Sequence, residues 1–263
     1  MPTIPVYVVD AFTRRPFSGN PAAVCPLESW LPDAQMQAIA AEHNLAETTF
    51  VVREPEGWRI RWFTPAVEVD LCGHATLAAA HVLTRHRGLP EETIVFHSRS
   101  GPLPVGFAGD TIVLDFPARP AARCEVPAAL REGLGVNPVE VLKSRDFLVV
   151  LESEDDVRAL APDFAQLARV DCLGVIVTAP ARRESGVDFV SRFFAPRAGI
   201  DEDPVTGSAH CTLTPYWAAR LKRKELHARQ VSRRGGELFC TLAGDRVHIA
   251  GHAVTYLTGS AEI

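Results

Sequence analysis

The sequence lacks the motifs that mark several large classes of protein. No G-x-G-x-x-G segment follows its first expected strand and no G-x-x-x-x-G-K-[ST] segment occurs, which argues against a bound dinucleotide or nucleoside triphosphate. No apolar run reaches the roughly 20 residues of a membrane-spanning helix. No basic region followed by a continuous apolar stretch opens the chain. We therefore expect a cytoplasmic protein with no membrane partner.

Charge clusters and paired cysteines are absent as well. The 27 basic and 32 acidic residues leave a net charge of −5, and no cluster of Lys or Arg is interleaved with aromatic residues. Nucleic acid is therefore not an expected partner. The six cysteines are widely spaced, without a C-x-x-C pair or a nearby histidine at metal-ligand spacing. We expect reduced thiols, no metal site and no cofactor.

The chain does contain enough apolar sequence for a large core, because 47% of its 263 residues are hydrophobic. Strand and helix patterns run through both halves, including one helix expected over residues 154–169. Residues 117–127 (PARPAARCEVP) are rich in proline and have no clear periodicity. We place a domain junction there, with an N-terminal lobe over 1–117 and a C-terminal lobe over 118–263. The last strand can pack back on the first lobe.

Two segments repeat a pattern. Residues 61–83 (RWFTPAVEVDLCGHATLAAAHVL) and 192–217 (RFFAPRAGIDEDPVTGSAHCTLTPYW) both begin with Arg, an aromatic residue, Phe, any residue and Pro. An acidic loop and a glycine before an apolar helix follow in both. Gly73 comes eight positions after Pro65 and Gly207 eleven after Pro196, so the second copy has three extra residues. This pattern favours an internal duplication, with Gly73 and Gly207 facing each other across a cleft.

A glycine at the start of a buried helix suits the binding of an anion. The first turn of a helix leaves backbone N–H groups unpaired at the positive end of its dipole, and glycine lets a ligand approach them closely. His74 and Ser208 would add side-chain donors. For one helix alone, a turn glycine and an ordinary N-cap serine would explain the pattern. Because the pattern occurs twice, we favour a site for a small carboxylate.

Four segments resemble the signature of the PhzF family, the phenazine-biosynthesis-type isomerases. These are GNPAAV at 19–24, NLAETTFV at 44–51, and the two copies of the repeat. The resemblance implies an α+β fold like that of diaminopimelate epimerase. In that fold two pseudo-symmetric lobes each wrap a mixed sheet around a buried central helix. The resemblance also implies a homodimer.

The resemblance further implies which residues act. Glu47 matches the family's general acid and base, His74 and Asp203 match its other catalytic polar groups, and the substrate contacts fall on Gly73, Gly207 and Ser208. The implied reaction is a cofactor-free proton transfer within a small carboxylic acid. Each polar residue also has a plain alternative. Glu47 can be a solvated residue before a strand, His74 a hydrogen-bonded core imidazole, and Asp203 a turn former before a proline.

Cys72 opens a second possible chemistry. Diaminopimelate epimerase and proline racemase use two opposed cysteines as acid and base, and Cys72 stands directly before Gly73, where one such thiol would belong. The matching position before Gly207 is Thr206, which is too weak an acid to be the partner. A two-base racemase that uses Cys72 is therefore the second hypothesis. A non-catalytic binder of an acidic metabolite is the third.

Overall fold

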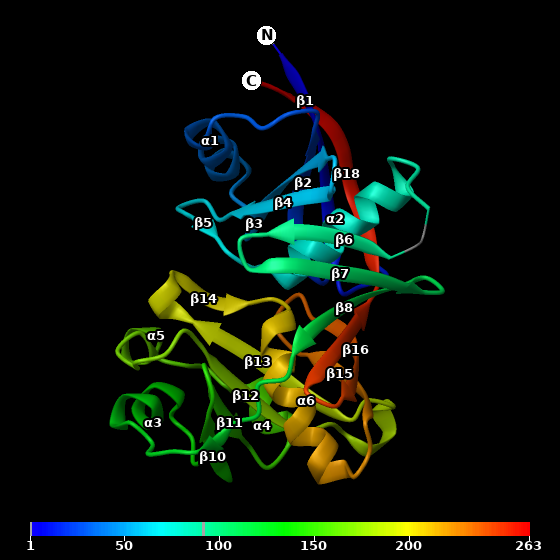
Figure 1. Cartoon of the computed structure of the whole chain (residues 1–263). Helices are drawn as coiled ribbons and strands as arrows, with labels where there is room; N and C mark the ends of the chain where they lie inside the picture. Colours follow the sequence, from blue (N-terminus) through cyan, green and yellow to red (C-terminus); the bar gives the residue numbers. More distant parts are fainter. Residues whose placement is uncertain (1, 91–92) are drawn as a thin grey trace. The chain divides into compact units, whose positions relative to one another are not determined.

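The computed structural model describes residues 2–90 and 93–263. The chain divides into two compact units, of which the first is formed by Met1–Asp115 with Ala250–Ile263 and the second by Phe116–Ile249 (Figure 1). The sequence-based division assigned the last residues to the second lobe but allowed the last strand to pack back on the first. They lie in the first unit because strand β18 (Ala253–Glu262) pairs antiparallel with β1 (Thr3–Ala11) along the whole of β1.

The first unit contains one mixed sheet. Strand β1 lies between β18 and β2, β2 runs parallel to β3, and β3 is antiparallel to β4. Strand β4 is antiparallel to the short β5 and parallel to β6, which begins the β6–β7–β8 meander. The further elements are β2 (Asn20–Leu27), α1 (Asp33–His43), β3 (Glu47–Glu54), β4 (Gly57–Phe63), β5 (Glu68–Val69), α2 (Gly73–Arg85), β6 (Ile94–Ser98), β7 (Gly101–Ala108) and β8 (Thr111–Pro117).

The second unit repeats this order of pairing. The pairs β10·β11, β11·β12, β12·β13, β13·β15 and β15·β16 are in turn antiparallel, parallel, antiparallel, parallel and antiparallel. The pairs β1·β2, β2·β3, β3·β4, β4·β6 and β6·β7 follow the same sequence. A short antiparallel strand is added at the same place in both, β5 on β4 and β14 on β13. The predicted pseudo-symmetric α+β architecture is therefore confirmed.

The elements of the second unit include several short helices. They are β9 (Ala122–Arg123), α3 (Ala128–Leu134), β10 (Glu140–Lys143), β11 (Phe147–Val150), α4 (Glu154–Ala159), α5 (Phe164–Leu167), β12 (Val175–Pro180), η1 (Arg183–Ser185), β13 (Phe189–Ala195), η2 (Pro196–Ala198), β14 (Ile200–Asp203), α6 (Gly207–Leu221), β15 (Glu225–Gln230), β16 (Gly236–Ala243) and β17 (Arg246–Gly251). The single helix predicted over 154–169 is wrong. The chain leaves helical geometry at Leu160, and Pro162 keeps the helix from continuing because proline has no backbone N–H for a helical hydrogen bond.

One long helix is buried in the core of each unit. In α2 every residue from His74 to Leu83 is buried except the half-buried His81. The helix packs against β1, β2, β3 and β18, and its run of small residues lets the strands approach closely. In the second unit α6 is buried over most of its length and packs against β15 and β16. No helix in the described part of the chain has the length and hydrophobicity needed to cross a lipid bilayer.

Candidate active site

In the first unit, two strand starts and one helix start meet at one edge of the sheet. Asn20 begins β2 and Glu47 begins β3, and these strands are parallel with Ala22 opposite Glu47. Helix α2 begins at Gly73, so His74 lies in its first turn. The N-cap residue Cys72 makes no side-chain capping bond, which leaves the first-turn N–H groups without that partner.

His74 connects the polar groups of this edge. Its Nε2 lies 3.0 Å from Oε2 of Glu47, and its Nδ1 lies 3.2 Å from the amide nitrogen of Asn20 and 3.4 Å from Sγ of Cys72. His74 is buried, and Glu47 is half-buried. The buried atoms Nε2 and Oε2 are close but make no aligned hydrogen bond. Buried polar atoms in this state are rare in folded proteins, and catalytic contacts often tighten only when the substrate binds.

Burial and neighbouring charge shift the pKa of His74 in opposite directions. Burial by itself lowers the pKa of His74, but neighbouring negative charge outweighs it and holds the pKa well above 6.5. Burial raises the pKa of the Cys72 thiol to about 11, and the negative charge of Glu47 acts in the same direction. Because Cys72 is therefore a neutral thiol near pH 7, we assign the raised pKa of His74 to the carboxylate of Glu47.

The same three side chains carry atoms that can bind a metal. One ligand atom each from Glu47, Cys72 and His74 lies within 4.8 Å of the others. However, Cys72 contacts Nδ1 of the imidazole and Glu47 contacts Nε2, two nitrogens that point away from each other. A single ion bound at one nitrogen would need the residue at the other nitrogen to move, since zinc–ligand bonds are only about 2.0–2.3 Å long. The arrangement suits proton exchange between Glu47 and His74 better than coordination.

In the second unit, Asp203 is held within a small polar network. It ends β14, and the Thr206 hydroxyl donates a close hydrogen bond to its carboxylate. The buried amide of Gln230 fixes the same segment. Its nitrogen donates to the backbone oxygen of Asp203 at 2.7 Å, and its oxygen accepts the backbone N–H of Thr206 at 2.9 Å. Asp203 is therefore placed directly before the start of α6.

The start of α6 carries the two other predicted residues of this unit. Gly207 opens the helix, Ser208 follows it, and the N-cap Thr206 makes no side-chain capping bond. Arg145 donates a hydrogen bond of 3.2 Å to the Ser208 hydroxyl and is itself anchored on the buried carboxylate of Asp146 at 2.7 Å. The helix start is thus accompanied by a guanidinium group.

The structure brings the predicted residues together in two groups. Glu47, Gly73 and His74 meet in the first unit, and Asp203, Gly207 and Ser208 lie together in the second. That Gly73 and Gly207 face each other across one cleft stays a prediction.

Three residues that touch these groups were not predicted from the sequence. Asn20 falls within the GNPAAV segment, but nothing in its local pattern separates it from an ordinary polar residue after a glycine. Arg145 and Gln230 contact the start of α6 but lie far from it in the sequence, so no local spacing indicates them.

Comparison with known proteins gives a consistent result. Residues 9–259 match the family described as phenazine biosynthesis-like protein, PhzC-PhzF. The chain is 60% identical to an uncharacterized isomerase of Pseudomonas aeruginosa, with 95% of each chain covered. It is 47% identical to a PhzF-family phenazine biosynthesis protein of Enterococcus faecalis. The crystal structure of that protein matches with a TM-score of 0.96, covering 100% of both chains.

A more distant solved structure shares the fold. The hydroxyproline epimerase of Agrobacterium vitis has a TM-score of 0.61 at 10% identity, covering 98% of this chain and 92% of that one. At this identity the likeness concerns the fold alone, and it confirms the epimerase-like architecture.

Proposed function

Because the chain belongs to the PhzF family of phenazine biosynthesis-like proteins, we propose that it moves a proton within a small carboxylic acid without a cofactor. The chain is an isomerase, as the relatives at 60%, 51% and 47% identity are named. In this proposal it acts in the cytoplasm as a homodimer, on a small metabolite, with no nucleic-acid or membrane partner.

The contact between Glu47 and His74 is the observation that carries the proposal. A carboxylate 3.0 Å from a buried imidazole is held in a fixed orientation, which a general base needs. Glu47 takes a proton from one carbon of the substrate, and the electron pair enters the conjugated system. The carboxylic acid so formed returns a proton to another carbon. One C–H bond breaks, another forms, and no oxidant or reductant is needed.

The remaining predicted residues bind the acid and its developing charge. The proposal assigns substrate contacts to Gly73, Gly207 and Ser208, at helix starts whose N-cap residues make no side-chain cap. Asp203 is the further polar catalytic group, held by Thr206 and Gln230.

Replacing the carboxylate of Glu47 tests this function. Glu47→Gln keeps the size of the side chain but cannot accept a proton, so turnover should fall by roughly a hundredfold to ten-thousandfold, the usual contribution of a positioned acid–base group. Incubation with a panel of small unsaturated carboxylic acids in heavy water, followed by NMR, measures turnover as deuterium entering the product. Glu54→Gln, at the other end of β3, is the matched control and should leave turnover within about twofold. Full turnover by Glu47→Gln would refute the proposal.

The racemase hypothesis remains as a second candidate because Cys72 lies 3.4 Å from His74. Two observations weigh against it. Burial raises the pKa of this thiol to about 11, and the repeat places Thr206 where a second thiol is needed. The third hypothesis, a binder without turnover, predicts that a panel acid binds equally to the wild type and to Glu47→Gln while neither converts it.

A further inference from the structure

The segment that leads into each buried helix is anchored at a fixed distance from the helix start. Gly73 follows Glu68 by five positions, and Gly207 follows Glu202 by five. The three extra residues of the second copy all precede this point, since Glu68 follows Pro65 by three positions and Glu202 follows Pro196 by six. The length of the loop varies before the glutamate and is constant after it.

The two glutamates are bound in the same way by the arginines that open the repeat. Arg61 binds Glu68 through two bonds of 2.7 and 2.8 Å, and Arg192 binds Glu202 through two bonds of 2.7 and 2.9 Å. Each guanidinium also lies over a phenylalanine ring two residues later in its strand, at 5.2 Å in the first unit and 4.9 Å in the second. These side chains are at most 20% exposed, which makes each pair rigid in comparison with a surface ion pair.

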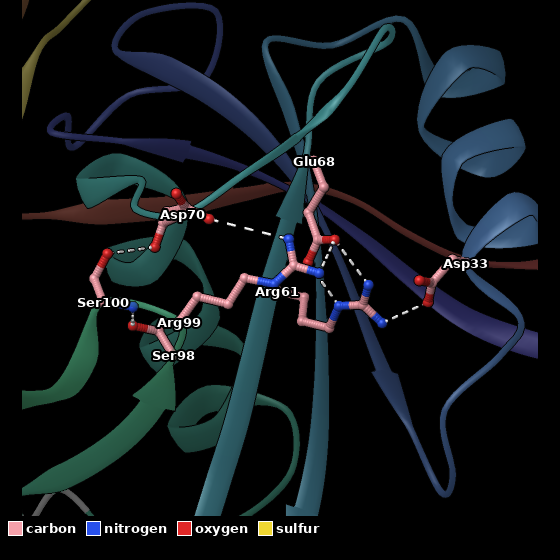
Figure 2. A network of polar contacts seen from close by, with 7 residues as sticks. All are labelled: Asp33, Arg61, Glu68, Asp70, Ser98, Arg99 and Ser100. Atoms are coloured by element: carbon pink, nitrogen blue, oxygen red, sulfur yellow. Dashed lines mark hydrogen bonds and ion pairs between the residues drawn. The ribbon is translucent and has the colours of Figure 1, made fainter.

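A second tether holds the same segment. Ser100 donates to the backbone oxygen of Asp70 at 2.9 Å, and Ser232 donates to the backbone oxygen of Pro204 at 2.7 Å. Asp70 follows Glu68 by two residues and Pro204 follows Glu202 by two, so the tethers are equivalent. In the first unit Arg99 adds a bond of 2.7 Å to Glu68, and Figure 2 shows both arginines converging on this carboxylate.

The groups with catalytic chemistry do not repeat in this way. The positions of Cys72 and His74 are occupied by Thr206 and Ser208 in the second copy. The position of Glu47 falls on Gly174, because Phe63 pairs with Thr48 and its counterpart Phe194 pairs with Val175. The two units therefore share the contacts that hold the loop before the buried helix, but not the side chains of the candidate acid–base group.

We propose that Arg61 and Glu68 are positioning residues that fix the segment before α2 and so hold His74 against Glu47. This inference rests on the proposed function only for its effect on turnover. Arg192 and Glu202 do the same for the segment that carries Asp203. A one-ångström displacement of a positioned group can cost about a hundredfold in rate, so the ion pair affects the reaction without touching the substrate.

The test uses the full-length protein with Arg61→Lys, which keeps the charge but cannot bind a carboxylate in the two-bonded manner. The ring signals of His74 are followed by NMR through a pH titration without substrate, and are assigned with a His74→Gln sample. In Arg61→Lys the pKa of His74 should fall toward its ordinary value of about 6.5 because His74 moves away from the carboxylate of Glu47. With a substrate from the panel, kcat should fall roughly ten- to hundredfold while KM changes less.

Arg192→Lys is the matched control, since it weakens the equivalent pair in the other unit. It should lower the melting temperature about as much as Arg61→Lys but leave the titration of His74 as in the wild type. The inference is overturned if Arg61→Lys leaves His74 titrating as in the wild type, or if both variants shift it equally. This titration needs no turnover. Normal turnover by Glu47→Gln would therefore refute the proposed function without deciding the role of Arg61.

Discussion

His210 makes the stability of the protein depend on pH. It is fully buried in α6, and its Nδ1–H donates to the backbone oxygen of Thr206 at 2.9 Å. Its Nε2 is buried without a hydrogen-bond partner, so a second proton would place an unpaired charge in the core. Burial lowers its pKa to about 4. The unfolded chain, with a pKa near 6.5, binds this proton first as the pH falls.

We therefore predict that the free energy of unfolding decreases as the pH falls from about 6.5 to about 4, and is insensitive to His210 above that window. Between pH 7 and pH 5 the wild type should lose roughly 2 kcal/mol more than His210→Gln, which lacks the titrating group. Urea unfolding at several pH values gives both slopes. Comparing how the free energy of unfolding changes with pH in the two proteins removes any pH-independent loss of stability caused by the substitution. Parallel slopes would show that His210 does not titrate in this way.

The candidate residues themselves could be predicted from the sequence, but their contacts could not. Glu47 and His74 are separated by 27 positions, and their meeting depends on which strand starts lie beside the start of α2. That arrangement follows from the parallel pairing of β2 with β3, a long-range feature without a local signal. Asn20 was missed for the same reason, since its role appears only when its amide lies 3.2 Å from the imidazole.

At the scale of elements, the start of β2 depends on a glycine. Gly19 precedes Asn20 with a φ of +69°, and a Cβ placed on it would lie 2.2 Å from the backbone oxygen of Ala11. Both the left-handed conformation and the close approach of backbone atoms exclude a side chain there. Gly186 has the same φ of +69° but open space around its Cα, so it isolates the effect of conformation.

Gly19→Ala should thus destabilise the protein by clearly more than Gly186→Ala, which should cost about 1 kcal/mol from the strained conformation alone. Chemical denaturation of both variants measures the difference. Because Asn20 contacts His74, Gly19→Ala should also disturb the His74 signals in NMR spectra. Equal losses of stability in the two variants would show that the contact with Ala11 is not restrictive.

The order of elements was largely predictable, and the one exception has a physical cause. The apolar pattern over 154–169 continues through Pro162. Periodicity alone therefore predicts one helix where the structure has α4 and α5. The pairing of β18 with β1 agrees with the expectation that the last strand can pack back on the first lobe, but its register is set by hydrogen bonds between the two ends of the chain, which no periodicity encodes. The repeat could be recognised in the sequence because Arg61 and Arg192 each begin a nearly identical five-residue segment.

For the whole molecule, the repeat gives each unit a similar Arg–Glu ion pair, whereas among the described residues the contact between Glu47 and His74 has no counterpart in the second copy of the repeat. The ion pairs of Arg61 and Arg192 are alike in geometry, whereas Glu47 has Gly174 as its counterpart. A side chain at position 174 would meet the ring of Phe193, so the second unit has no room for an equivalent glutamate without rearrangement. In the proposed function the proton-transfer group therefore belongs to the first unit.

If the reaction needs only these side chains, turnover should survive metal removal. We predict that exhaustive dialysis against EDTA changes kcat by less than about twofold, because acid–base transfer by a carboxylate requires no Lewis acid. Added zinc should inhibit turnover. Glu47, Cys72 and His74 can rearrange to bind the ion, and a metal-bound Glu47 carboxylate cannot accept a proton. Activity that disappears with EDTA and returns with zinc would contradict the cofactor-free mechanism.

The most direct test of the central claim compares Glu47→Gln with Cys72→Ser on the same substrate in heavy water. Glu47→Gln should incorporate deuterium roughly a hundredfold to ten-thousandfold more slowly than the wild type. Cys72→Ser should stay within a few-fold of it, because the buried thiol is not ionised. A folded Cys72→Ser protein that exchanges no deuterium, beside a Glu47→Gln protein of nearly normal rate, would refute proton transfer by Glu47 and assign it to the thiol.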